Sequence, residues 1–135
     1  MIRFVVPGEP KGKGRPRFCR NGHTYTDSKT KAYEDHIKAC YLEQVGTRRS
    51  SGCLRVALRA FLSAPKRSSV KTLERMAKGE IRPSKKPDAD NVAKAIADGL
   101  NGIAYNDDAA IVSLSIEKYY SQTPRVVVEI EEIEG

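Results

Sequence analysis

The chain has 135 residues, of which 39% are hydrophobic and 30% charged, and its formal net charge is +7 at pH 7. A chain of this length can bury the core of one globular domain, which we expect to span residues 1–135. It has three widely spaced cysteines, no apolar run of membrane-spanning length and no signal-peptide features at its start. These features argue against a disulfide framework, a membrane span and secretion. We expect a soluble protein of a reducing compartment.

The positive charge is concentrated in two segments. Residues 11–31 hold seven Lys or Arg and one acid, and residues 66–86 hold eight Lys or Arg and two acids. Segregated positive charge attracts a polyanion such as a phosphate backbone to one face. Small structural proteins share this bias, so the charge by itself says nothing about catalysis.

Hydrophobic periodicity and breaker residues predict the elements in chain order. Alternation predicts strands over residues 2–6, 54–62, 110–120 and 125–133. Helical spacing predicts helices over about 28–45, 68–78 and 90–101. The residues expected to face the core from the first helix are Ala32, Tyr33, Ile37, Cys40, Tyr41 and Val45. This order predicts an α+β domain with a mixed, largely antiparallel sheet and helices packed on one face.

A loop over residues 7–18 follows the first strand, and its prolines and glycines should deny it regular structure. The loop ends with two arginines beside an aromatic residue, which suits phosphate binding and base stacking. We therefore favour a DNA-contacting loop over a simply solvated one. We expect DNA contact also at Lys85 and Lys86, which precede Asp88. The candidate DNA-binding residues are Lys13, Arg15, Arg17, Phe18, Lys85 and Lys86.

The most informative stretch is 85–112, in which Pro87-Asp88-Ala89-Asp90-Asn91 leads into a helix and Asp107-Asp108 follows it. If Asp88 to Asp90 is extended, the two carboxylates point the same way. Acids that meet from both ends of such a helix can bind a hard divalent cation such as Mg²⁺. The alternative is that one Asp merely caps the helix, but a cap needs only one.

Lys94 lies one helical turn beyond Asp90 and one turn before Asp98, opposite an apolar stripe. That stripe consists of Val92, Ile96, Gly99, Leu100 and Ile103. Lys94 can make an i,i+4 ion pair, or it can place an ammonium beside the scissile phosphate. Both interpretations fit the sequence.

The acids after the helix have different expected roles. Asn and Asp commonly form turns, so we assign Asn106 and Asp107 to a turn. Two adjacent acids on a strand cannot both point into one site, so Asp108, at the start of the next strand, is the expected metal ligand.

With these motifs in view, the chain resembles the RusA family of Holliday-junction resolvases, particularly its phage-borne and Gram-positive-type members. The resemblance covers nearly the whole chain. Its most specific part is the stretch from Pro87 to Val112. The segments Lys13-Gly14-Arg15-Pro16-Arg17-Phe18 and Thr30-Lys31-Ala32-Tyr33-Glu34 also resemble family patterns. The N-terminal loop differs in length from the enterobacterial pattern, and the 66–78 insert is absent from the shortest members.

The resemblance implies a homodimeric endonuclease of recombination and repair that cuts four-way DNA by paired, symmetry-related nicks and leaves 5′-phosphate ends. It implies Mg²⁺ as cofactor, with Mn²⁺ as a substitute, and no small-molecule cofactor or membrane. Asp88, Asp90 and Asp108 would be the catalytic metal ligands and Lys94 the positively charged catalytic residue, while Phe18 would be the aromatic near the junction centre. The expected location is the cytoplasm of a bacterial or phage-infected cell.

Three alternatives remain open. The chain could be a DNA-binding module without activity, or a metal-dependent phosphohydrolase acting on smaller substrates. Independently, Cys19, His23, His36 and Cys40 form two pairs that could together bind structural zinc, although their spacing is not that of a standard zinc finger.

Overall fold

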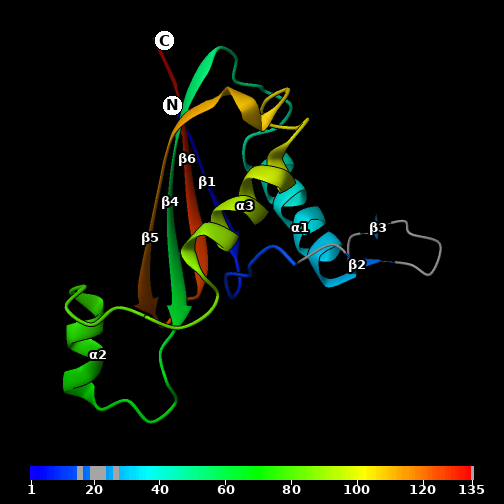
Figure 1. Cartoon of the computed structure of the whole chain (residues 1–135). Coiled ribbons are helices and arrows are strands. Elements are labelled where there is room, and N and C mark those ends of the chain that lie inside the picture. The colour runs from blue at the N-terminus through cyan, green and yellow to red at the C-terminus, as the bar shows by residue number, and fades with distance from the viewer. Residues whose placement is uncertain (15–16, 19–23, 26–27, 135) are drawn as a thin grey trace.

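The sheet of the domain has four strands in the order β1-β6-β4-β5 (Figure 1). The computed structural model describes residues 1–14 and 28–134, together with the backbone of 17–18 and 24–25. The strands are β1 (Ile2–Pro7), β4 (Cys53–Ser63), β5 (Ile111–Ser121) and β6 (Arg125–Ile133). β6 runs antiparallel to β1 and β4, whereas β4 and β5 are parallel. The sheet is therefore mixed, as predicted.

Two helices, α1 (Ser28–Gln44) and α3 (Ala89–Leu100), pack against each other on one side of the sheet (Figure 1). They are in close contact where Gly99 meets Ile37, since a Cβ added at Gly99 would lie 2.9 Å from the Ile37 Cδ1. The third helix, α2 (Val70–Ala77), stands apart at the far end of β4 and β5. No helix among the described residues is long and apolar enough to cross a membrane.

Alternate residues of β4 fill the core between the sheet and the two helices. Leu54, Val56, Leu58, Ala60 and Leu62 are all buried, as their period of two predicts. Four residues of the predicted stripe, Val92, Ile96, Gly99 and Leu100, are buried in α3. The fifth, Ile103, lies beyond the end of the helix and is partly buried against the core. The hydroxyl of the buried Tyr105 donates to the Ala97 carbonyl at 2.7 Å. A continuous core thus fixes α3 on the sheet.

Three local predictions are wrong. The loop after β1 is not wholly irregular, because β2 (Arg17–Phe18) pairs with β3 (Thr24–Tyr25). This pairing begins immediately beyond the last proline of the loop, where amide donors are again free to pair. Ala32 is exposed, because the buried face of α1 passes through the next residue, Tyr33. The chain after α3 enters a 3₁₀ turn, η1 (Asp108–Ala110), before β5 begins.

Candidate active site

Asp88 and Asp90 stand at the start of α3, but not as an extended pair. The helix begins at Ala89, so Asp88 is the N-cap residue, with φ −66° and ψ 146°, and Asp90 lies in the first turn. The Asp88 side chain makes no capping hydrogen bond, so capping does not account for it. Both residues are exposed, and neither forms an ion pair with any described residue. The positive end of the helix dipole favours carboxylates here.

Lys94 pairs with the acid that follows it on α3. Its Nζ lies 3.7 Å from Asp98 Oδ2, and its side chain is 62% exposed. The helix places Asp90 one turn before Lys94 and Asp98 one turn after it, and the ammonium is directed to Asp98. Asp90 therefore keeps an unpaired carboxylate, while Lys94 remains accessible to a ligand.

Asp98 also receives a lysine from the N-terminal loop. Lys13 Nζ lies 2.6 Å from Glu34 Oε2 on α1 and 3.2 Å from Asp98 Oδ2. Only 17% of the Lys13 side chain is exposed. Burial lowers the pKa of Lys13, but hydrogen bonds and charges from Glu34 and Asp98 outweigh burial and raise it. This lysine ties the loop to both helices, and its predicted DNA contact stays a prediction.

The loop backbone is fitted closely to the start of α3. The Lys13 amide donates to the Asn91 carbonyl at 3.0 Å. A Cβ added at Gly12 would lie 3.0 Å from the Asn91 Cβ and 3.4 Å from the Pro87 Cβ. Glycine lets the two backbones approach this closely. The basic loop is thereby held beside the residues that carry Asp88 and Asp90.

Asp108 is the first residue of η1 and Asp107 is its N-cap residue, so neither lies on a strand. This corrects the premise that assigned only one of them to the site. The Asp107 side chain accepts a hydrogen bond from the Ala109 amide at 3.2 Å, as expected for a turn residue. The Asp108 amide donates to Asn101 Oδ1 at 3.1 Å. In this turn the two carboxyl groups are close enough to hydrogen-bond.

The charges around Asp108 connect it to α3. Its pKa is raised first by the hydrogen bond with Asp107, then by burial and by the charges of Asp107 and Asp98, while Lys94 partly lowers it. The pKa of Asp107 is lowered, chiefly by the Ala109 amide. Asp108 thus lies within electrostatic reach of Asp98 and Lys94, residues from the second half of α3.

The structure brings some predicted residues together and leaves others apart. Within the described ranges, no group of three or more His, Cys, Asp or Glu side chains has the arrangement of a metal site. The joint binding of a metal by Asp88, Asp90 and Asp108 therefore stays a prediction. Sequence reasoning missed the partnership of Glu34 and Asp98 with Lys13. The helical spacing put Asp98 on the face of Lys94. Glu34 belongs to a segment that resembles a family pattern, but the sequence indicated no partner for it.

The other candidate DNA and zinc residues are only partly described. Lys86 is exposed, and Lys85 Nζ lies 5.6 Å from the centre of the Tyr120 ring. Arg15, Cys19 and His23 lie outside the described residues, and only the backbone of Arg17 and Phe18 is described. His36 Nε2 donates to the Pro7 carbonyl at 2.8 Å. Cys40 is buried, with Sγ 3.8 Å from the His36 ring nitrogens. Zinc binding by these four residues stays a prediction.

A small α+β domain with carboxylates and a lysine on one helix, beside basic segments, is typical of enzymes that act on phosphodiesters. The family described as Endodeoxyribonuclease RusA matches residues 7–131 of this chain. An uncharacterized protein of Bacillus subtilis strain 168, YqaN, is 36% identical over 137 residues, which are 98% of this chain and 96% of that protein. The chain belongs to the RusA family of endodeoxyribonucleases. The membership supports a hydrolase that acts on four-way DNA junctions, and members of the family generally depend on a divalent metal.

Proposed function

We propose that this protein is a Mg²⁺-dependent endonuclease that resolves four-way DNA junctions by paired symmetric nicks, acting as a homodimer. Mn²⁺ is expected to substitute for Mg²⁺, and the products are expected to be ligatable 5′-phosphate and 3′-hydroxyl ends. The observation that carries this proposal is that the three candidate metal ligands lack ion-pair partners among the described residues. Asp88, Asp90 and Asp108 form no ion pair with described residues, although the chain is strongly basic.

The donor set fits a hard divalent cation. Mg²⁺ prefers oxygen ligands and is commonly held by one or two carboxylates together with water and substrate phosphate. Asp88 and Asp90 are exposed carboxylates on a rigid helix start, and Asp108 is partly exposed. When bound, the cation would polarise the scissile phosphate and lower the pKa of a water.

The remaining chemistry belongs to side chains of this protein. Lys94 supplies a positive charge one turn from Asp90, where it can balance the charge that develops on the phosphate in the transition state. Asp98 and Lys13 hold that part of α3 against the loop. Arg15 and Arg17 bind backbone phosphates and Phe18 stacks on bases near the branch point.

The replacement Asp90→Asn tests the catalytic assignment. It removes a charge that has no partner among the described residues, so junction binding should stay within about two-fold while cleavage collapses. Asp35→Asn is the matched control, because Asp35 is an exposed acid of α1 whose side chain is 57% exposed. A comparable loss of binding in Asp90→Asn would instead identify Asp90 as a structural residue. Titration of Mg²⁺ and Mn²⁺ into the same assay tests the metal.

Two further measurements test the substrate and the assembly. Cleavage of a labelled four-way junction, challenged with an excess of free nucleotide, separates a junction nuclease from a phosphohydrolase of small substrates. Absence of cleavage with intact binding would indicate a DNA-binding module. Sedimentation of the protein alone tests the dimer, and nicks at symmetric positions in opposite strands test its paired action.

A further inference from the structure

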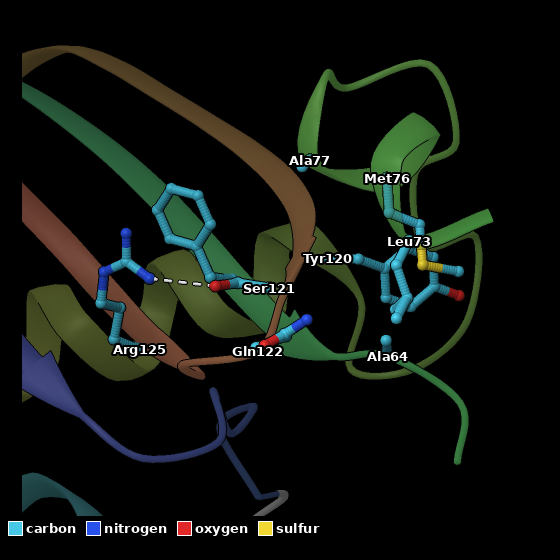
Figure 2. A pocket seen from close by; sticks show the side chains of 9 residues that line it. Ala64, Leu73, Met76, Ala77, Tyr120, Ser121, Gln122 and Arg125 are labelled. Carbon is cyan, nitrogen blue, oxygen red and sulfur yellow. Dashed lines mark hydrogen bonds between the residues drawn. The ribbon is translucent and has the colours of Figure 1, made fainter. Parts of the chain in front are cut away.

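A cavity of about 310 Å³ lies between α2 and the ends of the sheet strands (Figure 2). None of the residues that line it belongs to α3 or η1. Its walls include Phe61, Leu73, Met76, Ala77, Tyr120 and Gln122. In Figure 2, Leu73 and Met76 of α2 face Tyr120 of β5 and Ala64, beyond the end of β4. A pocket of this size can hold a flat, ring-shaped ligand.

The aromatic side of the pocket is part of a stacked row that runs across three strands. The Arg125 guanidinium lies 4.1 Å from the centre of the Phe61 ring. Phe61 stacks on Tyr119 with ring centres 5.5 Å apart and 24° between the planes, and Arg82 lies 4.2 Å above Tyr119. The Arg125 Nη1 also donates to Ser121 Oγ at 3.2 Å, as the dashed line in Figure 2 shows. This stacking holds the Phe61 ring in a fixed orientation at the pocket wall.

The cations around this pocket are suited to phosphate. Residues 66–86 carry eight Lys or Arg and two acids. Arg75 pairs with Glu80, and Arg82 pairs with Glu117. The exposed residues Lys66, Arg67 and Lys71 make no ion pair with any residue that the structure describes. A gap left by loose packing of α2 would need no such charges, whereas a site for a polyanion would.

The pocket also lies close to the candidate active site along the chain. Lys85 approaches the ring of Tyr120, a residue of the pocket wall, and the Lys118 ammonium donates to the Lys85 carbonyl. Asp88 follows three residues later, a path of at most about 11 Å. A DNA strand whose phosphate lies at α3 can therefore place a base from within a few nucleotides at this pocket.

We propose that the pocket under α2 takes an unstacked nucleobase of the branched DNA, while the free cations of the 66–71 segment bind the adjoining phosphates. The proposal rests on the proposed function, because it names a further feature of the same substrate. Bases at a branch point cost less to unstack than those inside a duplex. The helix insert thereby has a role in substrate recognition.

The test uses the full-length protein without metal and junctions that carry 2-aminopurine, one position at a time, near the cleavage site. Binding of the wild-type protein should change the fluorescence at one or two positions. Ala64→Leu and Ala77→Leu fill the pocket, so each should abolish that change and weaken junction binding about ten-fold. Ala39→Leu is the control, since Ala39 is an exposed alanine of α1. Thermal melting checks folding, and Ala77 is exposed, so at least this variant should fold.

A charge variant gives a second, independent measurement. Replacing Lys66, Arg67 and Lys71 by Gln should reduce the slope of log affinity against log salt by about two to three. The control Arg48→Gln, an exposed cation that follows α1, should leave the slope unchanged. The inference is overturned if no position responds with the wild type, or if folded filled variants keep the response. If the protein cleaves junctions but no 2-aminopurine position changes its fluorescence, only the base-pocket proposal is refuted. If the fluorescence changes but no metal-dependent cleavage occurs, only the nuclease assignment is refuted.

Discussion

Lys13 of the N-terminal loop lies 3.2 Å from Asp98 of α3, and the same ammonium lies 2.6 Å from Glu34 of α1. The three side chains are 15% to 22% exposed. The partly buried Lys13 ammonium thus connects the N-terminal loop, α1 and α3, which are distant in the sequence. Because Asp98 also pairs with Lys94 at 3.7 Å, the loop and the candidate catalytic lysine share one carboxylate.

The replacement Lys13→Met should lower the free energy of unfolding by about 1–3 kcal/mol, because it removes the lysine partner of Glu34 and leaves the neighbouring Asp98 with Lys94 alone. Urea denaturation measures the change. Lys31→Met is the matched control, since the Lys31–Asp35 ion pair spans 3.6 Å with side chains 71% and 57% exposed. An exposed pair of this kind contributes less than about 0.5 kcal/mol. Equal losses in the two variants would remove the special role of Lys13.

The contribution of Lys13 to the free energy of unfolding should decrease at alkaline pH. Burial lowers its pKa, but Glu34 and Asp98 raise it above the ordinary value of 10.5. A group whose pKa is higher in the folded state stabilises it fully below the unfolded pKa, and loses that effect as pH rises through the folded value. The difference in unfolding free energy between wild type and Lys13→Met should be constant from about pH 7 to about pH 9 and shrink above 10.5. A difference that grows with pH would contradict the assignment.

Asp107 and Asp108 should respond differently to loss of charge. Asp107→Asn keeps an oxygen that can accept the Ala109 amide, so cleavage should fall less than about ten-fold. Asp108→Asn removes a predicted metal ligand. Loss of an indirect partner of a metal commonly costs 10–100-fold, so loss of a ligand should exceed about 100-fold. Single-turnover cleavage of a junction measures both effects, and filter binding serves as the control. Equal effects would mean that the two carboxyls act as one unit.

Lys94→Gln should separate catalysis from stability. The Lys94–Asp98 ion pair is exposed on the lysine side, so unfolding free energy should change by less than about 0.5 kcal/mol. Cleavage should fall about 10²-fold, because a charge that stabilises the transition state is lost. Asp98→Asn should do the opposite and reduce stability, since Asp98 also holds Lys13. If Lys94→Gln unfolds the protein and Asp98→Asn does not, the roles are reversed.

The strands and helices could be predicted because each leaves a local pattern. Alternating apolar residues gave β4 and β6 to within one residue of their bounds, and one apolar stripe with a following glycine gave α3. The sequence also indicated that helix capping would not account for both Asp88 and Asp90, and the Asp88 side chain makes no capping hydrogen bond. These features depend on residues close together in the chain.

Features that depend on distant contacts could not be predicted. Lys13 looks like any other cation of a basic loop, and only the packing of the loop on α1 and α3 brings it to Glu34 and Asp98. Because α3 starts at Ala89, Asp90 lies within the helix and not on an extended segment, and because a 3₁₀ turn starts at Asp108, this residue does not lie on a strand. Such local boundaries decide where an acid points, and hydrophobic periodicity does not determine them.

Gly99→Ala tests the contact that seats α3 on α1. The new Cβ would lie 2.9 Å from Ile37 Cδ1 and 3.2 Å from Ile37 Cβ, and Ile37 is fully buried. The helices must separate or Ile37 must adopt a strained rotamer, so unfolding free energy should fall by about 1–3 kcal/mol despite the higher helix propensity of alanine. Because α3 carries Asp90 and Lys94, cleavage should fall more than the folded fraction does.

A double variant identifies the cause of that loss. Ile37→Val removes the methyl group that the new Cβ would meet, at a cost of about 0.5–1.5 kcal/mol in the wild-type background. Combined with Gly99→Ala, it should cost less than the sum of the two single losses, because the residues share one contact. Urea denaturation of the four proteins closes the cycle. Strictly additive losses would show that Gly99 is required for a reason other than its contact with Ile37.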